Sequence, residues 1–143
     1  MKGKTYFKYP NKYYYTDIGL RNARLNYRQY DPGHIMENII YNELLRKGYS
    51  VDVGVVTDRT RGANIQREID FIVNDADKKI YIQSAFQMNT EKKKSSELVS
   101  LTLTKDFFKK IIVRMDIPHN FYDEHGIFHC NLIDLLLGRV ELF

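Results

Sequence analysis

Hydrophobic positions in the first half of the chain recur at helical spacing before they change to strict alternation. Four apolar residues form an arc on one face of a helix predicted over residues 32–47: Ile40, Tyr41, Leu44 and Leu45. Asp31 is a typical N-cap before Pro32, and Gly48 is a typical helix terminator. Glu37 falls inside the apolar arc, so its carboxylate is expected at the rim of a cleft or beside a charged partner. The alternative is a surface glutamate near the helix start, where the helix dipole contributes only about 0.3–1 kcal/mol.

Alternation with a period of two then predicts three consecutive strands, over residues 51–57, 67–74 and 79–86. In the second strand, Ile69, Phe71 and Val73 are expected on one face and Asp70 on the other. A tight turn makes the second and third strands an antiparallel hairpin, in which Asp70 and Gln83 share a face. A slip of one residue in the register would separate them.

The remaining elements complete an α/β fold. Weaker signals predict an aromatic strand, a brief helix capped by Thr16 or Asp17, a lysine-rich helix and two further strands, over residues 12–16, 18–25, 89–101, 109–116 and 126–133. The core order of helix, three strands, helix and strand predicts a mixed central sheet flanked by helices. Residues 1–30 are expected as a basic, tyrosine-rich strand and short helix packed on the core, and residues 31–143 as the α/β domain.

The composition is that of one globular domain. A chain of 143 residues with 28% charged and 43% hydrophobic residues is long enough to bury a sizeable core. The sequence lacks an apolar run of about 18 residues, which a transmembrane helix needs, and its N-terminus lacks the apolar stretch of a signal peptide. The lone Cys130 excludes an internal disulfide and is expected as a buried thiol. We expect a soluble, cytoplasmic protein without membrane association.

The net charge of +4 comes from the N-terminal part of the chain. Residues 1–36 hold seven Lys/Arg, two Asp/Glu and many tyrosines, whereas acidic and basic residues nearly balance in the rest. Lysines beside stacking rings are typical of surfaces that bind single-stranded nucleic acid. Lys8, Lys12 and Arg21 of this segment are candidates for contacts with DNA or RNA, together with Arg61 and Arg67 from the rest of the chain. The alternative is a tyrosine-rich strand whose lysines face water, since tyrosine favours strands.

Glu37, Asp70 and Gln83 are the candidate site residues. Phosphodiester hydrolysis commonly uses a divalent cation, which takes one or two carboxylate ligands, polarises the phosphoryl oxygen and generates hydroxide. The carboxylates of Glu37 and Asp70 and the amide oxygen of Gln83 are suited to hold Mg²⁺ or Mn²⁺. For Asp70, the alternative is a structural ion pair with Arg61 or Arg67. The four histidines show no metal-ligand spacing.

Four stretches, in this order, resemble one family: KYYYTDIGLRNA, GHIMENIIYNELLRKGYSVDVG, REIDFIV and KIYIQSA. It is the uncharacterised domain at the C-terminus of many prokaryotic AAA+-type ATPases, and the likeness covers about residues 11–138. The resemblance implies a restriction-endonuclease-like fold of the PD-(D/E)xK superfamily. It also implies an ATPase module and a winged-helix segment that precede this domain as its partner. The chain holds no GxxxxGK[ST] phosphate loop, so we expect a C-terminal fragment or stand-alone remnant without ATPase activity.

Carried over from that superfamily, the helix acid falls on Glu37, the metal-binding aspartate on Asp70 and the Glu/Gln position on Gln83. The signature lysine falls on Ala85. Loss of one preorganised donor of this kind typically costs about 100- to 1,000-fold in rate. Lysines elsewhere are candidates to replace it: Lys92, Lys93, Lys94 and Lys79.

We therefore expect a nuclease-like domain that is catalytically weak or inactive and acts as a nucleic-acid-binding or assembly module. One alternative is an active metal-dependent DNA or RNA nuclease with a relocated lysine. Another is a protein-interaction domain without a nucleic-acid role, whose exposed apolar residues, either near residues 133–137 or among the N-terminal tyrosines, bind a partner or form a homo-oligomer.

Overall fold

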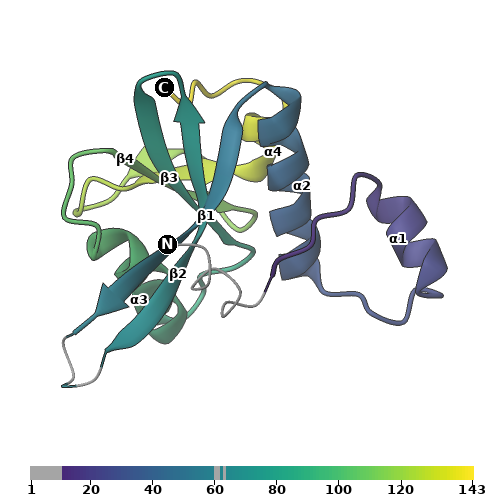
Figure 1. Ribbon diagram of the computed structural model, residues 1–143, viewed down its shortest axis with the longest axis horizontal. Coiled ribbons are helices and arrows are strands. Elements are labelled where there is room, and N and C mark those ends of the chain that lie inside the picture. Colours follow the sequence, from purple (N-terminus) through teal and green to yellow (C-terminus); the bar gives the residue numbers. More distant parts are fainter. Residues whose placement is uncertain (1–10, 60–61, 63) are drawn as a thin grey trace, which may run out of the picture.

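The computed structural model describes residues 11–59, 62 and 64–143, and a six-stranded mixed sheet lies at its centre (Figure 1). The strands are β1 (Ser50–Asp58), β2 (Ile65–Asp75), β3 (Lys78–Ala85), β4 (Lys109–Arg114), β5 (Phe121–Tyr122) and β6 (Phe128–Asn131), in the spatial order β1-β2-β3-β4-β6-β5. Strands β1 to β3 are antiparallel neighbours, and β5 is antiparallel to β6. Strand β4 runs parallel to both β3 and β6.

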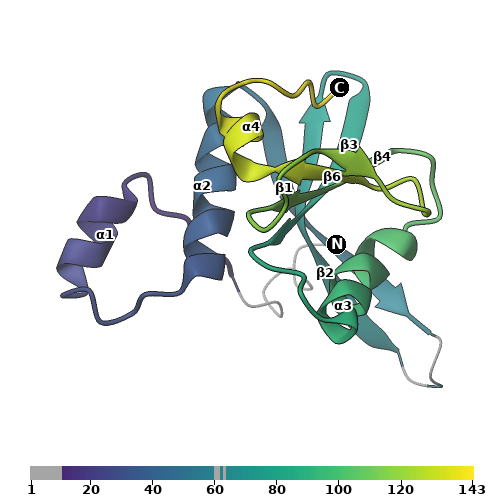
Figure 2. The same ribbon diagram turned by 180° about the vertical axis from the view of Figure 1, so that it is seen from behind.

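Helices cover both faces of this sheet (Figures 1 and 2). Helices α2 (Pro32–Arg46) and α4 (Leu132–Leu136) bury apolar side chains against one face, in the larger core cluster. Helix α3 (Glu91–Thr102) closes the smaller cluster on the opposite face. The chain passes through α2, β1, β2, β3, α3 and β4 in the predicted order, so the predicted α/β class and flanked mixed sheet are confirmed. None of the described helices is long and apolar enough to cross a membrane.

Helix α2 begins and ends where its sequence predicts. The Asp31 carboxylate accepts hydrogen bonds from the backbone N–H groups of Gly33 and His34, which satisfies two otherwise unpaired donors of the first turn. The helix ends before Gly48, whose φ of 85° is readily adopted only without a side chain. The apolar arc is narrower than predicted because Leu45 is 47% exposed.

Residues 12–15 form an extended segment on α2, which we call the strap, and the prediction of a strand over 12–16 is wrong. The strap binds helix side chains in place of a neighbouring strand: Tyr15 N–H donates to Asn38 Oδ1 at 2.8 Å, and Asn38 Nδ2 donates to Tyr15 O at 2.8 Å. Tyr14 stacks on Tyr41 of α2 with ring centroids 4.0 Å apart. The aromatic side chains that predicted a strand are thus used for packing on a helix.

Helix α1 (Ile18–Arg24) follows the strap and stands away from the sheet, on the far side of α2 (Figure 1). Asp17 caps it by accepting from the Leu20 N–H at 2.8 Å, as predicted for one of two candidate caps. None of its residues is buried. The short helix therefore contributes no buried side chain to the core, and residues 1–10 of the expected N-terminal unit lie outside the described residues.

Strand β2 carries a β-bulge beside the candidate aspartate. Its register against β1 shifts between Asp52 and Gly54, so that Asp70 and Phe71 together oppose the single residue Val53. Gly54 allows close approach here, because a Cβ atom on it would lie 2.8 Å from Cδ1 of Ile72.

The bulge changes which side chains share a face. Ile69 packs with Ile72 in the cluster under α3, whereas Phe71 and Val73 pack in the cluster under α2. The prediction that Ile69 shares a face with Phe71 and Val73 is wrong, because it assumed uninterrupted alternation. With the extra residue in the strand, Asp70 turns toward the α2 side together with Phe71.

Candidate functional site

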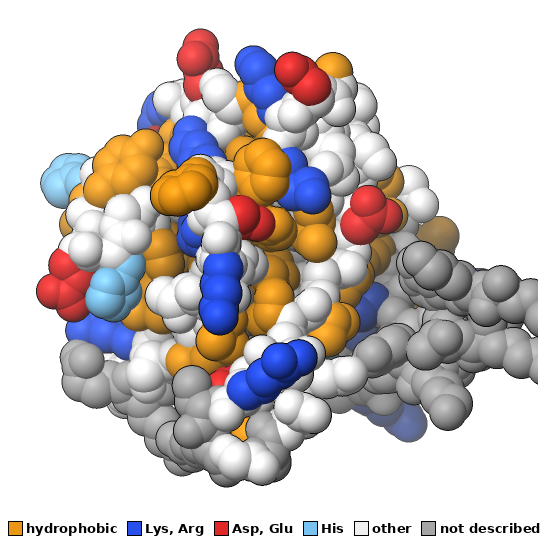
Figure 3. Space-filling view, turned by 60° about the vertical axis from the view of Figure 1, so that its left-hand side comes forward, with side chains coloured by type: hydrophobic (Ala, Val, Ile, Leu, Met, Phe, Trp, Pro, Cys, Tyr) orange, Lys and Arg blue, Asp and Glu red, His pale blue; other side chains and the backbone are white. Residues whose placement is uncertain are grey.

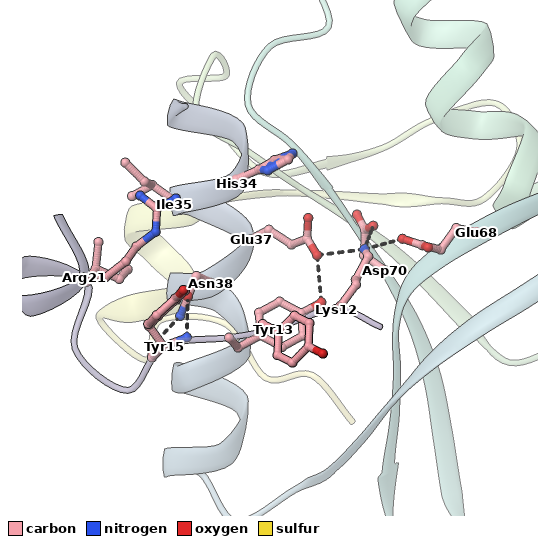
Figure 4. A pocket seen from close by; sticks show the side chains of 12 residues that line it. Lys12, Tyr13, Tyr15, Arg21, His34, Ile35, Glu37, Asn38, Glu68 and Asp70 are labelled. Atoms are coloured by element: carbon pink, nitrogen blue, oxygen red, sulfur yellow. Dashed lines mark hydrogen bonds and ion pairs between the residues drawn. The ribbon is translucent and has the colours of Figure 1, made fainter. Parts of the chain in front are cut away.

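A single ammonium group lies between three carboxylates where the strap crosses from α2 to β2 (Figure 4). Lys12 Nζ is 2.8 Å from Glu37 Oε1 and 3.1 Å from Asp70 Oδ1, and it also forms an ion pair with Glu68. These residues line a pocket of about 430 Å³ that also includes His34. Glu37 and Asp70 thus both contact Lys12, which was predicted from the sequence to contact DNA or RNA.

The side chains of this cluster come from three elements, which are α2, β2 and the strap. Glu37 projects from α2, and the bulge in β2 turns Asp70 toward that helix. The Asn38 amide fixes the strap beside Glu37 by pairing with both backbone groups of Tyr15. The hydroxyl of Tyr14 donates to Glu37 Oε1 at 2.7 Å, so the same carboxylate oxygen accepts from two strap residues.

Asp70 is the most buried acid of the cluster, with 10% of its side chain exposed. Its Oδ2 accepts from the Ser84 N–H at 2.8 Å, while Oδ1 faces Lys12. Burial, with the charge of Glu37, raises the pKa of Asp70 to about 6, although Lys12 and the Ser84 N–H favour the ionised form. Three carboxylates share one ammonium, so negative charge is only partly compensated.

The same imbalance acts on the two strap residues. Burial alone would lower the pKa of Lys12, but the charge of Asp70 and hydrogen bonds to Glu37 and Glu68 raise it well above its ordinary value. Burial and the hydrogen bond to Glu37 raise the pKa of Tyr14 in the same way. Both groups therefore keep their protons throughout the physiological pH range, and Lys12 is a permanent cation in this pocket.

Gln83 does not join Glu37 and Asp70 in the pocket. Its side chain turns toward α3, where Nε2 donates to Glu97 Oε2 at 3.2 Å and Oε1 faces Ser100 Oγ at 3.5 Å. The Asp70 N–H also donates to Gln83 Oε1 at 3.4 Å. Donors from the protein therefore already occupy the amide oxygen expected as a third metal ligand. Burial raises the pKa of Glu97, the acid that this amide contacts.

The arrangement does not fit a divalent cation. A magnesium ion needs oxygen ligands at about 2.0–2.1 Å and tolerates little distortion, whereas the ammonium of Lys12 lies against Glu37 and Asp70 at hydrogen-bond distance. Within the described part of the chain, no three His, Cys, Asp or Glu side chains are grouped as metal ligands. Glu37, Glu68 and Asp70 form a charge-paired cluster with Lys12.

The lysines predicted to replace the signature lysine lie elsewhere. The position of that lysine, Ala85, is buried under α3. Lys93 is exposed, Lys94 is half-buried on α3, and Lys79 lies over the ring of Phe108 at 5.3 Å. The side chain of Lys92 lies outside what the structure describes. Among the described lysines, Lys12 is the one within ion-pair distance of Asp70.

Of the described candidates for nucleic-acid contacts, Lys12 and Arg21 line the same pocket and Arg67 does not. Arg67 pairs with Asp58 at 3.0 Å and not with Asp70, so the predicted structural partner of Asp70 is replaced by Lys12. Arg21 lies at the edge of the same pocket, on α1. Lys8 and Arg61 lie outside the described residues.

Sequence reasoning missed that Lys12 binds the two acids, and it missed Tyr14, Glu68 and Glu97 altogether. Lys12 is 25 residues from Glu37 and 58 residues from Asp70 along the chain. No local spacing connects residues so far apart. The one usable signal is Glu68, which shares the short REIDFIV stretch with Asp70.

The fold and site define a mixed α/β domain whose acidic pocket is closed by a lysine of its own chain. Residues 32–127, well over half of the chain, match the family described as "Domain of unknown function (DUF4143)", and the chain belongs to that family. An uncharacterized protein of Haemophilus influenzae is 36% identical over 113 residues, which are 79% of this chain and 26% of that protein. The chain thus spans about a quarter of the length of this relative. No solved structure matches the chain.

Proposed function

We propose that this chain is a nuclease-like domain of an AAA+-type ATPase that binds nucleic acid without cleaving it. One observation carries the proposal: the Lys12 ammonium lies against both Glu37 and Asp70, where a cleaving domain of this kind would hold its divalent cation. The order α2-β1-β2-β3-α3-β4, which the restriction-endonuclease-like core is expected to have, supports it. Ala85 at the position of the signature lysine supports the inactive state.

An ammonium neutralises the acids but cannot replace the chemistry of a metal ion. It has no vacant coordination position, so it neither polarises a phosphoryl oxygen as a Lewis acid nor activates a bound water. Because Lys12 is tethered by the strap, its effective concentration at the acids is high, in the millimolar range or above for a short tether. A divalent ion from solution would have to displace this group.

The link to an ATPase and to nucleic acid rests on other observations. The chain spans about a quarter of its Haemophilus relative, which leaves room for further modules in proteins of this family. An AAA+-type ATPase is the module that the family resemblance implies, and this supports the proposed link. The excess of basic residues in positions 1–36 is the feature that favours a nucleic acid as ligand.

The test combines cleavage and metal binding. The 143-residue chain is incubated with plasmid, single-stranded DNA and RNA in millimolar Mg²⁺ or Mn²⁺, and metal uptake is measured by calorimetry. We expect no cleavage and no metal uptake, and uptake of Mn²⁺ in Lys12→Met but not in the matched control Lys105→Met, since Lys105 is exposed. Robust cleavage that disappears in Asp70→Ala would overturn the proposal.

The position of Lys12 also favours a second candidate function, that of an active metal-dependent nuclease. Lys12 lies 3.1 Å from Asp70 Oδ1 and could serve as the relocated signature lysine once the strap shifts. The two candidates predict opposite effects of one substitution. If Lys12 is a relocated catalytic lysine, Lys12→Met abolishes cleavage; if it blocks the site, Lys12→Met leaves cleavage absent and increases metal affinity.

A further inference from the structure

We infer that residues 16–30, which we call the arm, together with the strap tyrosines form a binding surface for single-stranded DNA or RNA. This inference rests on the nucleic-acid-binding part of the proposed function and names the surface responsible. The arm contains α1 and projects from the body of the protein (Figures 1 and 2). Two tyrosines of the strap, Tyr13 and Tyr15, and two of the arm, Tyr27 and Tyr30, are exposed.

The arm is ordered by local polar contacts and not by a core. A helix of seven residues is too short to be stable alone, and none of its side chains is buried. Arg21 closes the arm: its Nη1 donates to Gln29 O at 3.1 Å, and its guanidinium lies 5.7 Å from the centre of the Tyr15 ring. The exposed surface of the arm is therefore held in place while remaining open to a ligand.

The backbone after α1 directs one aromatic ring into solvent. Asn26 and Tyr27 both have left-handed backbone angles, with φ of 49° and 56°. Asparagine tolerates this conformation, but it is unusual for a tyrosine and costs on the order of 1–3 kcal/mol. The side chain of Tyr27 is nevertheless 72% exposed. These two residues end α1, since the N–H groups of Asn26 and Tyr27 donate to Ala23 O at 3.0 Å and to Asn22 O at 2.9 Å, and this helix end leaves the Tyr27 ring available to a ligand.

The chemistry of the arm fits a single-stranded nucleic acid better than a protein surface. Arg24 and Arg28 are exposed on the arm, and the one acid of the arm, Asp17, is used as a helix cap. Leu20 is the one large aliphatic side chain of the arm that is strongly exposed. Rings for stacking on bases and arginines for phosphates are the combination that unpaired strands require.

Apolar exposure of the kind that favours protein partners is found elsewhere. Figure 3 brings the α3 and β4 side of the molecule forward and shows hydrophobic side chains at the surface, interspersed with lysines and arginines. Large exposed residues outside the arm and strap include Phe107, Phe108 and Tyr122. Tyr122 lies on β5, at the end of the sheet opposite β1, and provides a matched control for the arm tyrosines.

The experiment measures binding of fluorescein-labelled oligo(dT) and oligo(U) to the intact chain by fluorescence anisotropy over a range of salt concentrations. Tyr27→Asn combined with Tyr30→Ala removes two rings and is expected to weaken binding at least about 30-fold, because each base–ring stack is worth about 1–3 kcal/mol. Arg24→Ala combined with Arg28→Ala is expected to reduce the slope of log affinity against log salt by about 1.4, since each phosphate contact on a single strand contributes about 0.7. Tyr122→Ala and Arg139→Ala should leave affinity unchanged. Asparagine at position 27 keeps the left-handed backbone accessible, and circular dichroism checks that each variant is folded.

The outcomes separate this inference from the function on which it rests. If the chain binds oligonucleotides and the arm variants bind equally well, the arm is not the surface, although nucleic-acid binding stands. If no oligonucleotide binds, both the arm inference and the binding part of the proposed function fail, while the cleavage and metal measurements remain independent. If the arm variants instead abolish self-association detected by light scattering, without any oligonucleotide binding, the arm is a protein interface and the inference is overturned.

Discussion

Replacing Lys12 with methionine removes the one cation shared by three carboxylates while keeping most of the apolar stem of the side chain. Breaking a buried ion pair by removing one partner typically costs about 3–5 kcal/mol, because the other charge is left uncompensated. The Lys12 side chain is 24% exposed and that of Glu68 is 44% exposed, so water recovers part of the loss. We therefore expect the lower end, about 3 kcal/mol at pH 7.5. For a domain of this size, each kcal/mol shifts Tm by about 4 °C, which gives a loss of about 12 °C.

Thermal unfolding followed by circular dichroism measures this loss, and a second pH tests its cause. The pKa of Asp70 is about 6, so at pH 5 this carboxyl is largely neutral and less charge remains to be compensated. The destabilisation by Lys12→Met should therefore be clearly smaller at pH 5 than at pH 7.5. Lys105→Met, at an exposed lysine, controls for the loss of one positive charge. A Tm change below about 3 °C, or an equal loss at both pH values, would refute the shared-cation account.

Three further predictions address other parts of the same structure. The pKa of Asp70 is about 6 in the folded state and about 3.9 in the unfolded state, so its contribution to stability is greatest below pH 4 and decreases as pH rises to 6. Denaturant unfolding of the native chain and of Asp70→Asn should therefore show a difference in unfolding free energy that changes by about 3 kcal/mol between pH 4 and pH 6. Gly54→Ala should cost about 1–3 kcal/mol in urea unfolding, because the new Cβ lies 2.8 Å from Ile72 Cδ1 and 3.1 Å from Ile69 Cβ; an unchanged midpoint would contradict this packing. Asn38→Ala removes both hydrogen bonds to Tyr15, so hydrogen exchange should accelerate in residues 12–17 and stay unchanged in β4.

The parts of the fold that are set by local physics were predictable from sequence. The apolar arc of α2, its Asp31 cap and the glycine at position 48 depend on neighbouring residues, and each lies where the pattern places it. The alternating stretches became β1, β2 and β3 for the same reason. Local signals of this kind also placed Glu37 on a helix and Asp70 on the strand that follows β1.

The parts set by contacts between distant residues were not predictable. The strap was expected as a strand because tyrosines favour strands, but Tyr14 stacks on Tyr41 of α2 and Tyr15 pairs with Asn38. The face on which Asp70 lies depends on a bulge that the alternating pattern does not reveal. The direction of Gln83 depends on Glu97, an acid of α3 whose position relative to β3 no spacing rule provides.

Because of the extra residue at the bulge, the number of residues in this part of β2 decides which side chains face α2 and which face α3. Removing one residue between Ile69 and Ile72 would restore even pleating, and one side chain instead of two would then face α2 between them, so either the pocket would lose Asp70 or the core under α2 would lose Phe71. A change in the length of the turn between β1 and β2 would have no such effect, because it does not alter the alternation of side chains within either strand. Among family members, a single-residue insertion or deletion in this short stretch should thus alter the pocket more than most substitutions in it.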